Sequence, residues 1–234
     1  MRQLPLPVRL RASSVFDSFF SGPNDAVVRQ LQSLESGRSP VVVWLYGAPS
    51  VGKTHLLQAI CARAGQRGQA AAYLPLRESS ALAPSVLAGY EALSFVCLDD
   101  LEAIAGDASW ERALFRLYTE LEESRGRMII AAPSPPIAVA IQLPDLASRL
   151  AAGLVLRLQP LSDDEQLFAL QARATQLGLE LPLDAAQYLL RRLPRDMSTL
   201  CNALQTLDEE SLATRRRLTV QLVREVLERP RAMS

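Results

Sequence analysis

One eight-residue motif, G-x-x-x-x-G-K-T, constrains the fold of this chain more than any other feature. Residues 41–46 before it form a short apolar run rich in β-branched and aromatic side chains, which is typical of a buried strand. Residues 55–62 after it carry apolar side chains at helical spacing. A strand, a glycine-rich turn and a helix in this order predict backbone N–H groups around a phosphate at a helix N-terminus. The motif residues are Gly47, Ala48, Pro49, Ser50, Val51, Gly52, Lys53 and Thr54.

Two acidic residues complete the expected nucleotide site. In a loop of this type the lysine, Lys53, reaches the β- and γ-phosphates, and the hydroxyl of Thr54 binds Mg²⁺. Asp99 ends a hydrophobic segment and is expected to hold the Mg²⁺ hydration shell opposite Thr54. Asp100 is a candidate for polarising an attacking water. The alternative is that these adjacent acids form an ordinary turn at the end of a strand.

Composition excludes several function classes. The 25 basic and 25 acidic residues give a formal net charge of +0, which argues against a strong nonspecific nucleic-acid footprint. With 49% hydrophobic residues the chain is expected to be globular, and its apolar runs are too short for a membrane span. No signal peptide is recognisable near Met1, so we expect a cytoplasmic protein. Cys61, Cys97 and Cys201 are far apart, which favours buried thiols over a metal site.

Alternating strand and helix patterns predict an α/β fold in which a parallel sheet carries helices on both faces. Apolar residues recur at helical spacing between Trp110 and Leu121, and we expect that stripe to face the core. The expected strands are residues 41–46, 70–74, 95–98, 128–132 and 154–158. The expected helices are residues 25–34, 55–62, 86–93, 110–121 and 143–150.

The pattern changes near Pro160, beyond which no strand is expected. A capping box, Ser162 to Glu165, opens a helix, and further helices are expected at 184–192, 197–211 and 220–228. The chain therefore divides into an extended leader at 1–12, an α/β nucleotide-binding domain at 13–160 and a small all-helical lid domain at 161–234. The run at 215–217 is interpreted as a solvated turn rather than a nucleic-acid patch.

Arg149 is a further candidate for function. It lies in a short expected helix near the end of the α/β domain. One interpretation is a surface ion pair with Asp145, four residues earlier. The other is an arginine finger that acts in trans on a nucleotide in a neighbouring subunit, where a guanidinium stabilises the charge of phosphoryl transfer. Periodicity does not choose between them.

These motifs together resemble the AAA+ ATPases of the DnaA family, over roughly residues 13–228, and more narrowly the DnaA-related regulators that inactivate the initiator. The resemblance implies that Arg149 is the finger arginine and that the segment from Phe16 to Asn24 helps to wall the adenine pocket. We therefore count Phe16, together with His55 on the first turn after the loop, among the candidate nucleotide contacts. For His55 the plainer alternative is a polar residue without a role in the site.

The leader supports the same resemblance. Its residues Gln3, Leu4, Pro5, Leu6, Pro7 and Val8 are similar to the clamp-binding peptide of those regulators. The prolines restrict the free peptide, while Leu4 and Leu6 supply apolar anchors for the β sliding clamp of DNA polymerase III. Val8 stands where leucine is usual. Because the sequence ends soon after the lid, we expect no DNA-reading helix-turn-helix domain and no direct sequence-specific DNA binding.

The sequence also departs from the family. Ser134 follows Pro133 where a polar residue senses the γ-phosphate, and Ser198 stands where DnaA has its second sensor arginine, with Arg195 one turn away. The resemblance implies that the chain holds ADP or ATP with Mg²⁺, hydrolyses it weakly and promotes hydrolysis of ATP bound to DnaA.

Two other functions remain open. One is a self-sufficient AAA+ ATPase that works as a loader or remodeller through its own homo-oligomer. The other is an adaptor in which the nucleotide is purely structural.

Overall fold

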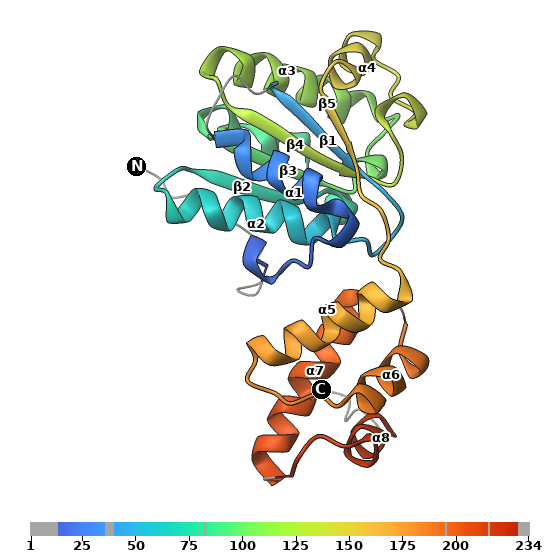
Figure 1. The fold of residues 1–234 in the computed structure, drawn as a ribbon. Helices are drawn as coiled ribbons and strands as arrows, with labels where there is room; N and C mark the ends of the chain where they lie inside the picture. Colours follow the sequence, from blue (N-terminus) through green and yellow to red (C-terminus); the bar gives the residue numbers. More distant parts are fainter. Residues whose placement is uncertain (1–13, 36–39, 82, 195, 215, 229–234) are drawn as a thin grey trace. The chain divides into compact units, whose positions relative to one another are not determined.

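The computed structural model describes residues 14–35, 40–81, 83–194, 196–214 and 216–228 (Figure 1). The expected leader, residues 1–12, and Arg195 lie outside this part of the chain. The chain divides between Pro160 and Leu161 into two compact units, an α/β unit followed by a helical one. Each unit is described by itself below.

The α/β unit is built on a five-stranded sheet with the order β2-β3-β4-β1-β5. All neighbouring strands are parallel, which confirms the fold class predicted from the sequence. The first strand lies inside the sheet, between the fourth and the fifth, so the loop that follows it starts from an interior position. The strands are β1 (Val42–Tyr46), β2 (Ala71–Pro75), β3 (Phe95–Asp99), β4 (Arg127–Ala132) and β5 (Leu154–Arg157).

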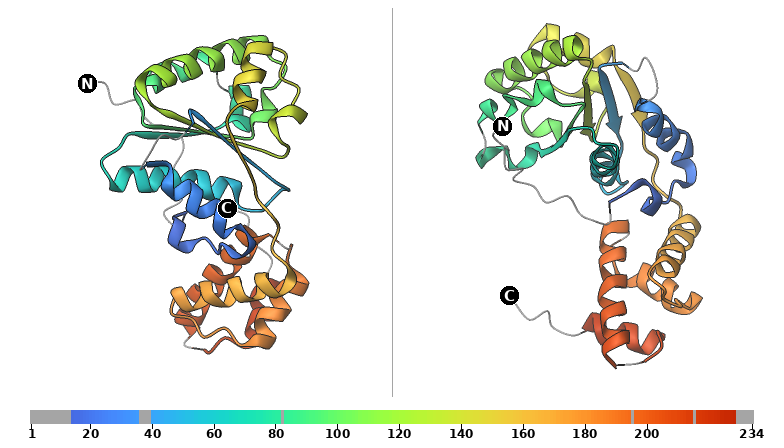
Figure 2. Two further views of the ribbon diagram at one scale, coloured as in Figure 1. Left: turned by 45° about the horizontal axis from the view of Figure 1, so that its top comes forward. Right: turned by 90° about the vertical axis from the view of Figure 1, so that its left-hand side faces the viewer.

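Helices cover both faces of this sheet. Figure 1 shows α1 (Asp25–Gln32) and α2 (Lys53–Gln66) on one face, with α3 (Ala108–Ser124) and α4 (Pro144–Ala151) on the other; Figure 2 shows the same two layers from other directions. The strands contribute alternate side chains to the two layers because successive residues of a strand point to opposite faces. In β1, for example, Val42 and Trp44 pack in the core under α3 and α4, whereas Val43 and Leu45 pack under α1 and α2.

The structure corrects the prediction of a helix at residues 86–93. The structure has two short 3₁₀ turns there, η5 (Pro84–Leu87) and η6 (Tyr90–Ala92), and no α-helix. Gly89 between them has a φ of 92°, in the left-handed region that stops a right-handed helix. The apolar residues Leu87 and Tyr90 of these turns are buried in the core beneath α3.

A buried asparagine joins the start of the α/β unit to its end. Asn24, which is 2% exposed, precedes α1. Its side-chain amide donates to the carbonyl oxygen of Gln159 at 2.9 Å and accepts from the N–H of Gln159 at 2.7 Å. This two-bond contact satisfies the backbone just after β5 and fixes the segment before α1 against it.

The helical unit contains α5 (Asp163–Gln176), α6 (Leu183–Arg192), α7 (Met197–Thr214) and α8 (Val220–Glu228). The predicted capping box is present: the Glu165 N–H donates to Ser162 Oγ at 3.3 Å, and the Ser162 N–H donates to Glu165 Oε2 at 2.8 Å. Arg216, from the basic run between α7 and α8, forms an ion pair of 2.7 Å with Glu225. The core of this unit is rich in leucine and includes Leu170, Leu189, Leu200, Leu204, Leu207 and Leu222.

Candidate nucleotide-binding site

The glycine-rich loop, residues 47–52, connects β1 to α2, and its two glycines are required by close contacts. A Cβ atom at Gly47 would lie 2.6 Å from the carbonyl oxygen of Leu158. A Cβ atom at Gly52 would lie 2.6 Å from Cε2 of Phe19, and Gly52 also has a φ of 101°. Side chains at either position would clash or strain the backbone. The two glycines therefore let the loop pass close to Leu158 and Phe19.

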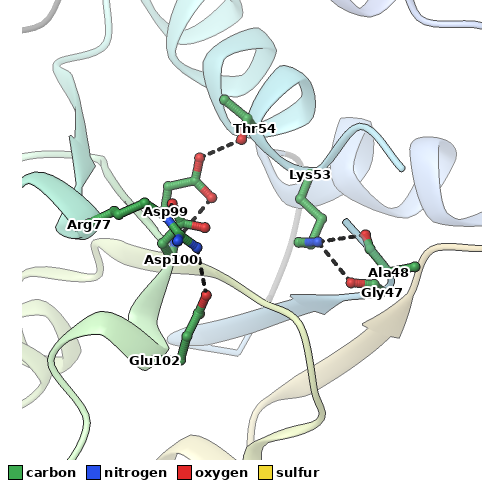
Figure 3. Close-up of polar contacts among 8 residues, drawn as sticks. All are labelled: Gly47, Ala48, Lys53, Thr54, Arg77, Asp99, Asp100 and Glu102. Carbon is green, nitrogen blue, oxygen red and sulfur yellow. Dashed lines mark hydrogen bonds and ion pairs between the residues drawn. The ribbon is translucent and has the colours of Figure 1, made fainter. Parts of the chain in front are cut away.

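Lys53, the first residue of α2, bridges the loop (Figure 3). Its ammonium donates to the carbonyl oxygens of Gly47 and Ala48, at 2.8 and 2.9 Å. Burial lowers the pKa of Lys53, while the negative charges of nearby carboxylates, Asp99 first, raise it. The charge of the ammonium thus lies at the mouth of the loop, where it favours an anion.

Asp99 faces Thr54 directly. The Thr54 hydroxyl donates to Asp99 Oδ2 at 2.6 Å, as Figure 3 shows, and the Asp100 N–H donates to Asp99 Oδ1 at 3.1 Å. Asp99 is only 2% exposed. Burial raises the pKa of its carboxyl group, and the hydrogen bonds from Thr54 and Tyr73 oppose that rise. The structure thus brings together the two residues that the sequence proposed as magnesium ligands.

Tyr73 is a site residue that the sequence analysis missed. Its hydroxyl donates to Asp99 Oδ2 at 2.8 Å. Burial and the charge of Asp99 raise the pKa of Tyr73 well above its usual range, so the hydroxyl stays protonated and remains a donor. The register of the sheet explains the contact, because Tyr73 of β2 lies beside Cys97 of β3. Cys97 and Asp99 share one face of β3, since side chains two residues apart in a strand do so.

Asp100, which follows Asp99, lies in an ion-pair network. It has a φ of 55°, and its Oδ2 accepts from Nε of Arg77 at 2.9 Å (Figure 3). The same guanidinium donates through Nη2 to Glu102 Oε1 at 3.3 Å. The sequence analysis did not single out Arg77, which follows β2 by two residues. In this structure the candidate water-positioning acid is therefore engaged by a cation.

His55 and Phe16 hold the segment before α1 against α2. His55 Nε2 lies 2.9 Å from the carbonyl oxygen of Val15 and 3.4 Å from Ser18 Oγ. Phe16 is 8% exposed and packs in the core under α1 and α2. The ring that covers the glycine loop is that of Phe19, which lies against Gly52 and 5.5 Å from the His55 ring. The direct nucleotide contacts expected of Phe16 and His55 remain predictions.

Arg149 is exposed on α4, while Leu146 and Leu150 of the same helix are buried. Its guanidinium carbon lies 5.5 Å from the centroid of the Tyr118 ring on α3, a cation–π distance. The Tyr118 hydroxyl in turn donates to Glu122 Oε1 at 3.0 Å. No ion pair joins Arg149 to Asp145 within the described residues. The surface-pair interpretation of Arg149 is therefore replaced by a contact with α3.

Ser134 and Ser198 stand at the two positions where a sensor residue is expected. The carbonyl oxygen of Ser134, just after β4, accepts from the Trp44 indole N–H at 2.9 Å. Ser198 lies exposed in the first turn of α7.

The residues proposed to bind the clamp, Gln3 to Val8, lie outside the part of the chain that the structure describes, and their role remains a prediction.

The oxygen atoms at this site suit a magnesium ion that is also bound by phosphate. The hydroxyl of Thr54 and the carboxylate of Asp99 are hard ligands of the type that Mg²⁺ prefers, and Mg²⁺ commonly uses only one or two carboxylates plus phosphates and waters. The described residues hold no group of three or more histidines, cysteines or acids that could bind a metal ion by themselves. In the same part of the chain, no helix is long and apolar enough to cross a membrane.

Comparisons with known proteins agree with the fold and with the lid. Residues 163–227 match the family model described as the lid domain of Hda. Domain III of the Thermotoga maritima replication initiation protein DnaA superimposes with a TM-score of 0.78, at 20% identity over 94% of this chain and 98% of that one. AMPPCP-bound DnaA from Aquifex aeolicus gives a TM-score of 0.72, at 19% identity over 88% of this chain and 68% of that one.

A more distant likeness is to RuvB from Thermotoga maritima, with a TM-score of 0.68 at 16% identity over 92% of this chain and 71% of that one. At these identities the structural matches establish the fold. The α/β unit and the helical unit that follows it in the sequence have a DnaA-like AAA+ fold. Residues 163–227 are similar to the lid domain of Hda, and the described chain is similar in structure to DnaA.

Proposed function

We propose that this protein is a negative regulator of replication initiation that binds an adenine nucleotide and stimulates hydrolysis of ATP bound to DnaA. The match of residues 163–227 to the Hda lid is the observation that carries the proposal, because it points to DnaA-related regulators within a widely used fold. The DnaA-like fold of the whole chain supports the same conclusion. The product would be DnaA–ADP, the inactive form of the initiator.

The protein's own nucleotide would lie on the glycine loop. The loop backbone would bind the phosphates at the N-terminus of α2, and Lys53 would turn from the carbonyl oxygens of Gly47 and Ala48 to the phosphate oxygens. Thr54 and Asp99 fit a Mg²⁺ ion, which would neutralise phosphate charge. Support for an adenine nucleotide comes from the similar DnaA structure, which was determined with AMPPCP bound.

Hydrolysis at this site would be slow. Arg77 binds Oδ2 of Asp100, so the guanidinium competes with an attacking water for this carboxylate. Ser198 also stands where an arginine would help to sense the nucleotide. These two features favour a holder of nucleotide, ADP or ATP, over the self-sufficient ATPase that the sequence left open.

Arg149 would act on the partner's nucleotide rather than on the protein's own. It is exposed, and buried Leu146 and Leu150 fix the helix that carries it. A guanidinium supplied in trans can accelerate phosphoryl transfer by several orders of magnitude, because it stabilises charge that develops in the transition state. To act in this way, Arg149 would exchange its contact with Tyr118 for a phosphate.

The leader would bring the protein to newly replicated DNA. Gln3 to Val8 would bind the β sliding clamp as an extended peptide, with Leu4 and Leu6 as its apolar anchors. Tethering to a loaded clamp raises the local concentration of Arg149 near DnaA without any new contact between the two proteins.

The decisive experiment follows the hydrolysis of radiolabelled ATP bound to DnaA, in the presence of DNA-loaded clamp and this protein. Wild-type protein should convert the ATP to ADP, and Arg149→Ala should reduce the rate by a factor of about 10³ or more. Arg149→Lys should also be poor, because an ammonium lacks the planar set of donors. As a control, Arg29→Ala, which replaces an exposed arginine of an ion pair on α1, should behave as wild type.

Other outcomes would select the other functions. Wild-type protein that does not stimulate hydrolysis refutes the regulatory proposal. Stimulation that survives Arg149→Ala removes the finger role and favours an adaptor that recruits DnaA to the clamp.

A further inference from the structure

A buried carboxylate on α3 is tied to the start of α4. Glu111 is 1% exposed and makes no ion pair among the described residues. Its Oε1 accepts from the N–H groups of Gly106 and Gln142, at 2.8 and 3.0 Å. Its Oε2 accepts from the N–H groups of Gln142 and Leu143, at 3.0 and 2.7 Å. Three backbone donors from two separate segments therefore converge on one carboxylate.

The start of α4 has no side-chain cap of its own, and the contact with Glu111 provides an acceptor there. The N-cap residue is Leu143, whose side chain cannot accept a hydrogen bond, and Pro144 follows it. Instead, Glu111 on α3 accepts hydrogen bonds from the N–H groups of Leu143 and Gln142. A negative charge at this end is also favoured by the helix dipole. The side-chain acceptor that α4 lacks at its own N-cap is thus supplied by a neighbouring helix.

The same neighbouring helix also contacts the other end of α4. Tyr118 lies seven residues after Glu111, about two turns along α3, and its ring is beneath the guanidinium of Arg149. A helix of eight residues is only about 12 Å long, so a tilt at its first residue moves its last turn. A displacement of about 1 Å at a reacting group can cost about a hundredfold in rate.

We propose that Glu111 is a positioning residue for Arg149: its carboxylate fixes the start and direction of α4, so that Arg149 is presented to an adenine nucleotide held by a partner protein. The inference rests on the proposed function for its catalytic consequence. The attachment itself is a property of this chain alone, and it can be tested without DnaA.

The first test measures amide hydrogen exchange by NMR in the full-length wild-type protein. The Gln142 and Leu143 amides precede the helix, so no hydrogen bond within α4 protects them. If Glu111 holds them, both should exchange at least tenfold more slowly than the amides of exposed loop residues. Fast exchange at both positions would overturn the inference, and this measurement requires no variant that might fail to fold.

The second test compares two isosteric variants on the same helix. Glu111→Gln replaces one acceptor oxygen by an NH₂ group, so at least one N–H donor then faces another donor. Glu123→Gln makes the same change of charge at an exposed position of α3. Exchange at Gln142 and Leu143 should accelerate in the first variant and not in the second. Equal exchange in wild type and Glu111→Gln would refute the attachment.

The third test is a double-mutant cycle in the DnaA assay, with each protein's own nucleotide affinity as the control for folding. Glu111→Gln should bind nucleotide as wild type does but reduce stimulated hydrolysis by about tenfold or more. In an Arg149→Ala background it should have no further effect, because it acts through Arg149. An equal loss in both backgrounds would overturn the positioning role. If wild-type protein gives no stimulation, the proposed function fails, and the exchange results still decide whether Glu111 holds α4.

Discussion

At the scale of single residues, Asp99 meets opposing demands from folding and from binding. It is almost fully buried, and burial raises the pKa of its carboxyl group because the charged form loses its hydration. Hydrogen bonds from Thr54, Tyr73 and the backbone of Asp100 offset part of that cost. A Mg²⁺ ion would offset more, since a cation stabilises the charged form. The surroundings of Asp99 thus favour ligand binding over stability of the free protein.

Tyr73→Phe should destabilise the free protein by about 2 kcal/mol, because a hydrogen bond to a buried charged group is lost. It should also raise the pKa of Asp99 further and weaken Mg²⁺-dependent nucleotide binding, most clearly below neutral pH. Chemical denaturation and nucleotide titration at several pH values test this. Tyr90→Phe is the matched control: Tyr90 is also buried, and no hydrogen bond of its hydroxyl is found within the described residues. Equal effects of the two variants would contradict the prediction.

Arg77→Ala should increase the intrinsic rate of ATP hydrolysis several-fold without a measurable change in stability. The Arg77 side chain is 70% exposed, and surface ion pairs of this kind contribute little to folding. Its removal would free Oδ2 of Asp100 to accept a hydrogen bond from water. Steady-state phosphate release measures the effect. Arg29→Ala, whose side chain is 71% exposed in a similar ion pair, serves as the control. An unchanged rate would mean that Arg77 does not limit Asp100.

At the scale of the element, α3 supports several parts of the α/β unit. One stripe of the helix packs on the sheet, while Glu111 and Tyr118 contact α4. Its N-terminus is capped by Asp107, whose side chain accepts from the N–H groups of Ser109 and Trp110, at 2.8 and 3.2 Å. Loss of this cap would loosen the first turn, which carries Glu111.

Asp107→Ala should lower the melting temperature at neutral pH, and the difference from wild type should shrink in acid. Hydrogen bonds from the Ser109 side chain, then from the backbone of Ser109 and Trp110, lower the pKa of Asp107 below its ordinary 3.8. A group whose pKa is lowered on folding adds stability above its unfolded pKa and loses it as the pH falls through its folded pKa. Thermal melts between pH 7 and about pH 3 measure this.

Asp107→Asn provides the control, because asparagine caps a helix without a titratable charge. This variant should stay close to wild type at pH 7 and gain on it as the pH falls below 4. A difference between wild type and Asp107→Ala that stays constant across the acid range would contradict the role of the charge.

The elements also show what the sequence could and could not predict. Residues 41–46, 95–98 and 110–121 have strong periodic patterns, and the strands and the helix formed there within one to three residues of the expected bounds. Residues 86–93 have similar spacing, but Gly89 prevents a helix. Thr54 could be proposed because it ends the glycine-loop motif, and Asp99 because it ends a hydrophobic segment. Tyr73, Arg77 and Glu111 could not, because their contacts depend on strand order and helix packing, which no local pattern encodes.

At the scale of the whole molecule, the proposed function draws on separate parts of the chain. The candidate nucleotide site and Arg149 belong to the α/β unit, whereas the match to the Hda lid lies in the helical unit. In the proposal the leader adds a third part, which acts only by localising the other two. The three contributions should therefore separate when each part is changed alone.

Deletion of residues 3–8 should abolish the dependence of stimulated hydrolysis on the DNA-loaded clamp and leave the protein's own nucleotide affinity unchanged. The tether raises local concentration by a factor that typically lies between about 10² and 10⁴, so excess protein should partly restore the lost activity. Arg149→Ala should not be rescued by excess protein, because it removes chemistry rather than encounter. Titration of both variants in the DnaA assay distinguishes these cases. Clamp-dependent activity that survives the deletion would refute the tether, and failure of excess protein to restore any activity would show that the leader does more than localise.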